Sequence, residues 1–175
     1  MYVTIKISYY FVNTKGCYLI MDRLEKIFPT YFENFELPEG AKEQTINVFR
    51  ACRTNLVEKE SFLPSFEEKG YCYTDKDDPT NPSVYSLSTY EKPKDVKRFA
   101  ITNSEYKKPF KIARGVTEPS CGPSQRTKER EKKRKDSHVD WWLYEGAEPF
   151  KSGDFNLIDD FEKFLSEFNK KRELE

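Results

Sequence analysis

The chain has one histidine among its 175 residues, and its four cysteines include no C-x-x-C pair. A structural zinc site needs about four clustered cysteine and histidine ligands, so the sequence excludes that class and indicates no other metal site. The cysteines lie far apart, and a chain of this length needs no disulfide framework. We therefore expect reduced thiols in a cytoplasmic protein.

Long apolar runs are also lacking. No stretch reaches the roughly 18 consecutive apolar residues that cross a bilayer, so no membrane partner is expected. Lys6 and Lys15 interrupt the N-terminal segment, and no small-residue cleavage site follows it, which argues against a signal peptide. Met21 is an alternative start, with residues 1–20 as an upstream extension. The oligomeric state stays open.

A third absence is net charge, because 30 basic residues balance 30 acidic ones. This excludes a uniformly basic nucleic-acid coat and leaves only local patches of one sign. Aromatic residues, in contrast, are abundant, with 14 Phe and 11 Tyr. Each ring can bury about 150–250 Å², so we expect a ring-rich core in one domain spanning residues 1–175.

Apolar periodicity predicts an α+β fold, with a mixed or antiparallel sheet, flanking helices and a C-terminal amphipathic helix. Val3, Ile5 and Ile7 alternate with polar residues before a turn, which indicates an N-terminal hairpin within residues 1–20. Similar alternation predicts four further strands, at residues 45–53, 83–88, 110–116 and 138–144.

Helical spacing marks three other stretches. One helix is expected to begin at Asp22, and a second to cover residues 94–102 after Pro93. The last should begin with Asp154 or Asn156 as its N-cap. Its apolar stripe comprises Leu157, Phe161, Phe164, Leu165 and Phe168. Residues 120–137 combine proline, glycine and charge, and are predicted to form a mobile basic loop.

The lone histidine lies in the richest chemical neighbourhood of the chain. On a strand, His138 and Asp140 point to the same face, so the carboxylate can orient the imidazole for general-base chemistry. Glu145 adds a second carboxylate at the end of that strand. The plainer alternative is a surface histidine beside a surface aspartate.

Residues 126–135 contain seven basic and two acidic side chains. One interpretation is a phosphate-contacting segment, with Trp141 and Trp142 nearby as stacking surfaces. The other is a solvated loop that its like charges keep extended. The basic residues are Arg126, Lys128, Arg130, Lys132, Lys133, Arg134 and Lys135.

Two arginines end the strand at residues 45–53. Arginine at a strand end can clamp a phosphate or carboxylate bidentately, and a pair of surface arginines is the structural alternative. The following strand carries hydroxyl and tyrosine side chains. Together these candidate binding residues are Arg50, Arg53, Tyr85, Ser86, Ser88 and Tyr90.

Along residues 46–150 the chain has a strand with arginines, then a strand with hydroxyl and tyrosine side chains, then a strand with acidic groups. This order resembles the ADP-ribosyltransferase fold, including its RES-type toxin relatives. In that family a first-strand arginine grips the phosphates or ribose of NAD, and Val48-Phe49-Arg50 is similar. A serine-threonine-serine strand supports the nicotinamide pocket, which Tyr85-Ser86-Leu87-Ser88-Thr89 resembles. A late glutamate stabilises the ribosyl oxocarbenium ion.

The chain departs from the family at the late acidic strand, since it has no E-x-E or Q-x-E pair. The acidic role then falls to Asp140, Glu145, Glu148 or His138. The resemblance implies an NAD-using transferase or hydrolase, of a kind found among toxins and effectors. Two alternatives remain: a nucleic-acid-binding protein or nuclease that uses residues 126–135, and a non-enzymatic protein-interaction domain.

Overall fold

The computed structural model of the chain describes residues 11–12, 18–19, 26–75, 77–104 and 108–173. Near the N-terminus, strand β1 (Phe11–Val12) pairs antiparallel with β2 (Tyr18–Leu19), in agreement with the predicted hairpin. The strand expected at Val3–Ile7 and the helix start expected at Asp22 lie outside the described residues.

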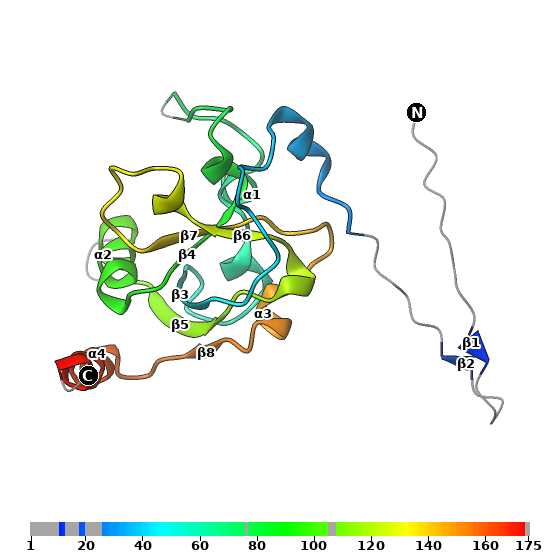
Figure 1. Cartoon of the computed structure of the whole chain (residues 1–175). Coiled ribbons are helices and arrows are strands. Elements are labelled where there is room, and N and C mark those ends of the chain that lie inside the picture. Colours follow the sequence, from blue (N-terminus) through cyan, green and yellow to red (C-terminus); the bar gives the residue numbers. More distant parts are fainter. Residues whose placement is uncertain (1–10, 13–17, 20–25, 76, 105–107, 174–175) are drawn as a thin grey trace.

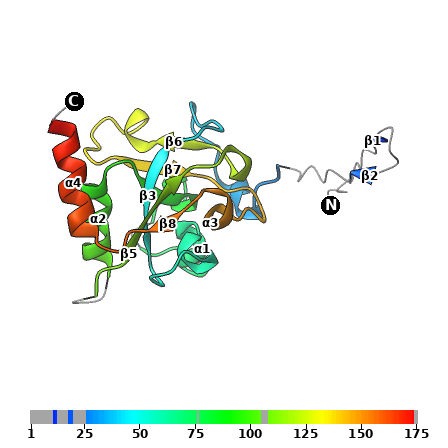
Figure 2. The same cartoon turned by 90° about the horizontal axis from the view of Figure 1, so that it is seen from below.

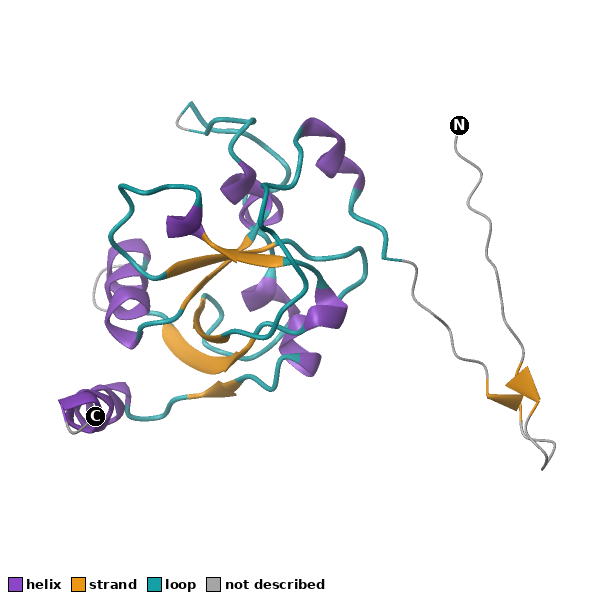
Figure 3. Ribbon diagram, in the orientation of Figure 1, coloured by secondary structure: helices purple, strands orange, loops and turns teal. Residues whose placement is uncertain are grey.

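Among the described residues, six further strands form one antiparallel sheet in the order β6-β7-β4-β3-β5-β8 (Figure 1). Helices flank this sheet, which confirms the predicted α+β class (Figure 3). The strands are β3 (Asn47–Cys52), β4 (Leu87–Tyr90), β5 (Lys111–Val116), β6 (Ser124–Arg126), β7 (His138–Trp141) and β8 (Asn156–Leu157).

Two of the helices, α2 (Pro93–Asn103) and α4 (Phe161–Glu173), lie side by side on one face of the sheet (Figure 2). The helices α1 (Ser65–Glu68) and α3 (Pro149–Ser152) are single turns. Short 3₁₀ turns occupy residues Thr30–Asn34, Lys59–Phe62, Pro82–Tyr85, Pro119–Cys121 and Thr127–Glu129.

Side chains on successive strand residues alternate between two cores, as the pleat requires. On β3, Val48 packs with Leu87 and Trp141 on one face. Phe49 packs on the other face with Tyr90 and with α2 and α4, whose Phe164 makes an edge contact to the Phe49 ring at 5.8 Å. A third cluster gathers aromatic rings around Phe66, Tyr85 and Trp142.

The two central strands part soon after they meet. Strand β3 pairs with β5 along its full length, from Asn47↔Val116 to Cys52↔Lys111. Its register with β4 consists of a single pair, Phe49↔Tyr90. Arg50 follows that pair, and its Nη1 donates to the Ser88 carbonyl of β4 at 2.7 Å. A side chain therefore links the two strands where their backbones separate.

Three predicted element boundaries are wrong. Residues 82–85 form a 3₁₀ turn, so β4 begins at Leu87; the Asn81 side chain accepts from the Ser83 N–H and Pro82 occupies the first turn. Strand β7 ends at Trp141. The last helix begins at Phe161, where Asp160 accepts from the Lys163 N–H at 2.9 Å, and β8 covers the cap expected at Asn156.

The prediction of a mobile loop at residues 120–137 is wrong for the first half of that segment. Residues 124–126 form β6, which pairs with β7 from Ser124↔Trp141 to Arg126↔Val139. Ser124, Gln125 and Thr127 are buried. The amide of Gln125 and the hydroxyl of Thr127 can be buried because hydrogen bonds compensate their desolvation, as when Gln125 donates to the Glu39 carbonyl at 2.7 Å.

Candidate functional site

Arg50 is a buried cation at the centre of the sheet, with 3% of its surface exposed. Its Nε donates to the Ser61 carbonyl at 2.9 Å and its Nη1 to the Ser88 carbonyl at 2.7 Å. Its Nη2 lies 2.5 Å from Glu68 Oε1. A buried charge is tolerated only with such partners, and the two carbonyls also fix the plane of the guanidinium.

A cavity of about 370 Å³ opens beside Arg50. It lies between the strand end, the 59–69 segment and helix α2. Arg53 lines the same cavity, and its Nε lies 3.0 Å from Glu68 Oε2. The residues that line it include Arg50, Arg53, Glu60, Glu68, Ser88 and Phe99.

Two carboxylates in this cavity have different environments. Glu68 bridges the two arginines, one carboxylate oxygen to each, and is mostly buried. Glu60 is exposed and has no ion pair or hydrogen bond with any residue that the structure describes. The cavity therefore contains an arginine pair already holding one anion, together with an unpaired carboxylate.

A second polar cluster lies on the other side of β4, around the fully buried Asp140. Its Oδ1 accepts from Ser86 Oγ at 2.6 Å. Its Oδ2 accepts from Thr127 Oγ1 at 2.6 Å and pairs with Arg130 Nη1 at 2.8 Å. Burial opposes ionisation, but the charges of His138 and Arg130 and the two hydroxyl bonds outweigh it, so the pKa of Asp140 is lowered.

His138 shares a face with Asp140, as predicted, but the two side chains do not bond directly. His138 Nδ1 lies 3.7 Å from Asp140 Oδ1, too far for a hydrogen bond. Thr127 Oγ1 lies 2.6 Å from that nitrogen and donates to Asp140, so the Nδ1–H of His138 donates to Thr127. Burial lowers the pKa of His138 to about 4.

Both members of this pair are buried, which excludes the surface alternative for His138 and Asp140. Hydroxyl and guanidinium groups bond to both oxygens of the Asp140 carboxylate, and neither Asp140 nor His138 lines the cavity beside Arg50. Asp140 and His138 thus organise β4, β7 and the Thr127 turn. Among the described residues, this role is structural, since both side chains are buried.

The structure brings only some of the predicted site residues together. Ser88 lies at the Arg50 cavity, whereas Ser86 bonds to Asp140. Tyr85 is buried among aromatic rings, with its hydroxyl donating to the Pro79 carbonyl at 2.8 Å. Arg50, Ser86 and Asp140, to which the resemblance assigns roles at one NAD site, therefore do not share a cleft; β4 separates the two groups.

Tyr90 is the link between the cavity and the buried cluster. Its ring lies 5.7 Å from that of Phe99, which lines the cavity, and 5.1 Å from that of His138. Burial and the charge of Asp136 raise the pKa of Tyr90 to about 12, against the opposing charges of Arg134 and Arg50. Both polar regions thus contact one aromatic side chain.

The late glutamates lie elsewhere. Glu145 and Glu148 line a separate cavity of about 480 Å³, together with Tyr31, Glu67 and Phe150. The 59–69 segment, which also lines the Arg50 cavity, forms part of its wall. Glu145 therefore does not face Arg50, and its predicted catalytic role has no support in this arrangement.

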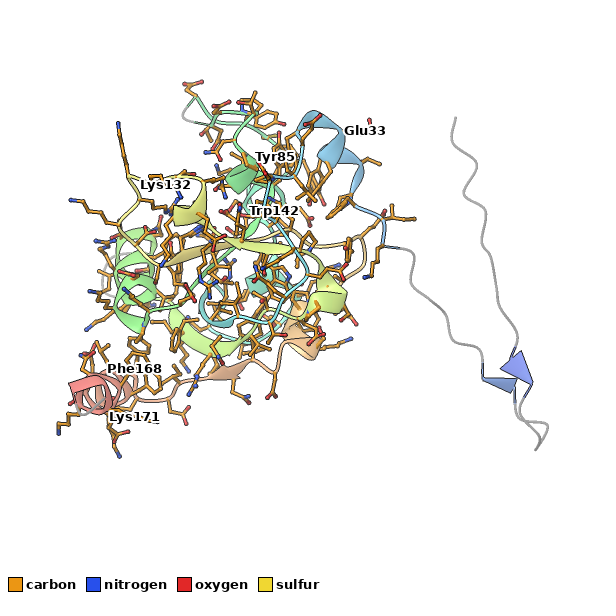
Figure 4. All side chains as sticks on the ribbon, in the orientation of Figure 1. Glu33, Tyr85, Lys132, Trp142, Phe168 and Lys171 are labelled. Atoms are coloured by element: carbon orange, nitrogen blue, oxygen red, sulfur yellow. The ribbon has the colours of Figure 1, made fainter. Side chains whose placement is uncertain are left out.

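In the basic segment at residues 126–135, the arginines and the lysines lie in different environments. Its arginines turn inward: Arg126 pairs with Glu91 at 2.8 Å, Arg130 with Asp140 at 2.8 Å and Arg134 with Asp136 at 2.7 Å. Its lysines are exposed, and none makes an ion pair with any residue that the structure describes. These are Lys128, Lys132, Lys133 and Lys135, of which Lys132 is seen to point away from the body in Figure 4.

The tryptophans do not form a surface. Trp141 and Trp142 are both fully buried, and their indole N–H groups donate to the Gly122 carbonyl at 3.1 Å and the Pro82 carbonyl at 2.9 Å. Figure 4 shows Trp142 inside the body, close to Tyr85. The prediction that either ring stacks on a base is wrong.

Sequence reasoning missed Glu60, Glu68, Phe99 and Thr127. Glu68 could have been suspected as a counter-ion for two neighbouring arginines, but its segment has no periodicity that places it beside them. Thr127 was hidden within the basic run. Only the tertiary structure brings these residues to the sites that they complete.

Within the described ranges, no three His, Cys, Asp or Glu side chains are grouped so that they could hold a metal ion. The described helices include none with the length and apolar character needed to cross a membrane. The cysteines Cys52, Cys72 and Cys121 are free, and Cys17 lies outside the described residues.

Comparison with known proteins gives no family. No protein-family model matches the sequence, and neither a curated protein nor a solved structure matches the chain.

Proposed function

We propose that the chain is an NAD-consuming enzyme of the ADP-ribosyltransferase type, with the Arg50 cavity as its dinucleotide site. One observation carries this proposal: two arginines from the end of a central strand share a cavity with a hydroxyl of the neighbouring strand and an aromatic ring. The predicted Arg50, Arg53 and Ser88 thus lie at one site. Asp140, His138 and Glu145 have no part in it.

The arginine pair supports recognition of the diphosphate of NAD. Guanidinium groups match phosphate geometry better than ammonium groups do, and the Ser61 and Ser88 carbonyls hold Arg50 in one orientation. Glu68 occupies the space between Arg50 and Arg53 and acts as an internal anion. In the proposed complex, the diphosphate replaces the Glu68 carboxylate at one or both arginines.

The rest of the cavity supplies groups for the nicotinamide riboside. Phe99 offers a ring face or edge to the nicotinamide, and Ser88 offers a hydroxyl to the ribose. A volume of about 370 Å³ is at the lower end of the roughly 300–1,000 Å³ typical of ligand pockets. We therefore expect it to enclose one half of the dinucleotide and leave the adenosine half nearer the surface.

Glu60 is the carboxylate available for the chemical step. When the bond from C1′ of the ribose to the nicotinamide nitrogen breaks, its electron pair stays on that nitrogen and neutralises the pyridinium. The remaining ribosyl cation needs a negative charge nearby. A water or acceptor hydroxyl then attacks C1′ and transfers its proton to the Glu60 carboxylate.

A cytoplasmic location and a toxin or effector role belong to the same proposal. Free cysteines at three described positions favour a reducing compartment. An enzyme that consumes NAD would act on the cytoplasmic pool of that cofactor. The acceptor of the ADP-ribosyl group is not specified by the cavity, and water suffices for a first assay.

Nicotinamide release from NAD by the purified full-length chain tests the proposal. Wild type should release nicotinamide, Glu60→Gln should not, and Arg53→Ala should be slower by roughly 10–100-fold, the equivalent of one charge-assisted hydrogen bond of about 1.5–3 kcal/mol. Arg114→Ala, an exposed arginine on β5 outside this cavity, serves as the control. The proposal fails if wild type shows no release, or if Arg53→Ala matches it.

A further inference from the structure

The lysines of the basic segment at residues 126–135 form a surface that the proposed enzyme site does not use. Each arginine of the segment is held by an acidic partner, as described above, and these contacts also neutralise Glu91, Asp136 and Asp140. The exposed cations that remain without an acidic partner among the described residues are Lys128, Lys132, Lys133 and Lys135.

Helix α2 extends this surface. Ser137 fixes the segment to the start of the helix, because its N–H and Oγ both donate to Asp95 Oδ2, at 3.0 and 2.8 Å, and its Oγ accepts from the Lys92 N–H at 2.8 Å. The segment and the helix are neighbours in Figures 1 and 2 alike. The helix and its N-cap add three exposed cations with no ion pair to described residues: Lys92, Lys94 and Arg98.

The result is an ordered cationic surface on a chain of zero net charge. Acidic side chains within these two segments are paired or buried: Asp95 bonds to Ser137, Glu129 lies 3.8 Å from Arg126, and Glu131 lies 3.7 Å from Arg134. The seven unpaired cations outnumber the two partly exposed carboxylates of this surface, Glu129 (45%) and Glu131 (40%), so its positive charge attracts polyanions.

We propose that this lysine surface (Lys92, Lys94, Arg98, Lys128, Lys132, Lys133 and Lys135) binds the phosphate backbone of nucleic acid. Exposed lysines bind phosphates as point charges, without the bidentate geometry that reads bases. Both tryptophans are buried, and the basic segment has no exposed aromatic ring for base stacking. Binding is therefore independent of sequence and strongly dependent on salt.

An anionic membrane is the less favoured partner. Interfacial binding needs apolar side chains that insert beside the basic ones. Among the described residues the exposed large apolar side chains are Ile27, Leu56, Tyr71, Tyr73 and Ile101, and only Ile101 belongs to either of the two segments. The surface provides charge without an apolar anchor.

The test measures binding of the full-length chain to a fluorescent DNA duplex of about 20 base pairs, across a range of salt concentrations. One variant changes Lys128, Lys132, Lys133 and Lys135 to Gln. A control changes Lys42, Lys163, Lys170 and Lys171 to Gln; these lysines are exposed and outside the surface, so the two variants have the same net charge. Unfolding midpoints of both variants confirm that they fold.

Wild type and the control should bind the duplex at low salt, with affinity that falls steeply as salt rises. The surface variant should bind at least about tenfold more weakly, with a salt slope smaller by roughly 3–4, because each lysine that neutralises a phosphate adds about 0.9 to that slope. Equal affinity of the two variants would overturn the proposal. So would binding to vesicles of anionic lipid together with no binding to DNA. Neither result depends on NAD turnover.

Discussion

At the scale of single residues, Asp140 is the most deeply buried carboxylate of the sheet. It has no exposed surface, and its partner Arg130 also lies over the Trp142 ring, 5.8 Å from its centroid. Removing one member of a buried ion pair leaves the other charge uncompensated. The ion pair and the Thr127 hydroxyl hold the Thr127 turn onto β7, and the Ser86 hydroxyl joins the start of β4 to the same carboxylate.

We therefore expect Arg130→Met to lower the free energy of unfolding by about 3–5 kcal/mol. The matched control is Arg126→Met, because the Arg126–Glu91 pair is partly exposed (34% and 24%) and such pairs contribute about 1 kcal/mol or less. Urea unfolding measures both values. Equal losses for the two variants would contradict the assigned role of Asp140.

His138 gives the protein a pH dependence that a single residue can explain. Its pKa is about 4 in the folded state and near 6.5 when unfolded, so the unfolded chain binds more protons between these values. Stability is therefore complete above about pH 6.5 and decreases as the pH falls towards 4, by up to about 3 kcal/mol.

Urea unfolding at several pH values tests this dependence, with His138→Gln as the comparison. That variant should lose most of the slope between pH 4 and 6.5. Because the chain has one histidine, its ring proton resonances report the same titration directly. A midpoint near 6.5 in the folded protein would show that His138 is not buried as described.

At the scale of elements, the turn into β6 depends on a glycine. Gly122 has φ +140°, and a Cβ built on it would overlap the Trp142 carbonyl oxygen, which is backbone and cannot rotate away. Gly146 also has a positive φ, +73°, but no atom lies within 4 Å of the position of its Cβ. Alanine substitutions at the two glycines therefore distinguish the cost of steric overlap, which arises at Gly122, from the cost of backbone strain alone, which arises at Gly146.

Gly122→Ala should destabilise the protein by several kcal/mol or prevent folding, since β6 would have to move away from β7. Gly146→Ala should cost only about 1–2 kcal/mol, the strain of a left-handed alanine. Thermal or urea unfolding compares them. Similar small losses in both variants would mean that β6 is not packed as described.

The elements also show what the sequence could and could not predict. Strands β3 and β5 and helix α2 have regular apolar spacing, and each was predicted to within about two residues. Strand β6 was missed because its buried side chains are Ser124 and Gln125, which have no apolar signature. The strand predicted at residues 83–88 begins later, because Asn81 caps a 3₁₀ turn that starts at Pro82. This local capping determines the backbone there in spite of the alternating pattern of apolar and polar residues.

The candidate site was predictable only in part, for a related reason. Arg50 and Ser88 belong to regular strands, so their neighbourhood follows from the pairing of hydrogen-bonded segments. Glu60 and Glu68 come from an irregular segment, whose path over the sheet depends on packing of Phe62 and Phe66 into two different cores. The seven basic residues at 126–135 looked uniform, although arginines and lysines have opposite orientations in the structure.

At the scale of the whole molecule, one sheet supports two separate polar regions. The Arg50 cavity opens where β3 and β4 part, and the Asp140 cluster fastens β7 and the basic segment on the other side of β4. Tyr90 contacts both through Phe99 and His138. The buried cluster thereby keeps β4 in place beside the cavity.

The central claim is that Arg50 and Arg53 bind the diphosphate of NAD in place of Glu68. Calorimetric titration of NAD into wild type, Arg53→Ala and Glu68→Gln tests it most directly, with folding of each variant verified first. Arg53→Ala should raise the Kd at least about tenfold, and Glu68→Gln should lower it because the competing charge is gone. Unchanged affinity in both variants, or no binding by wild type, would contradict the claim.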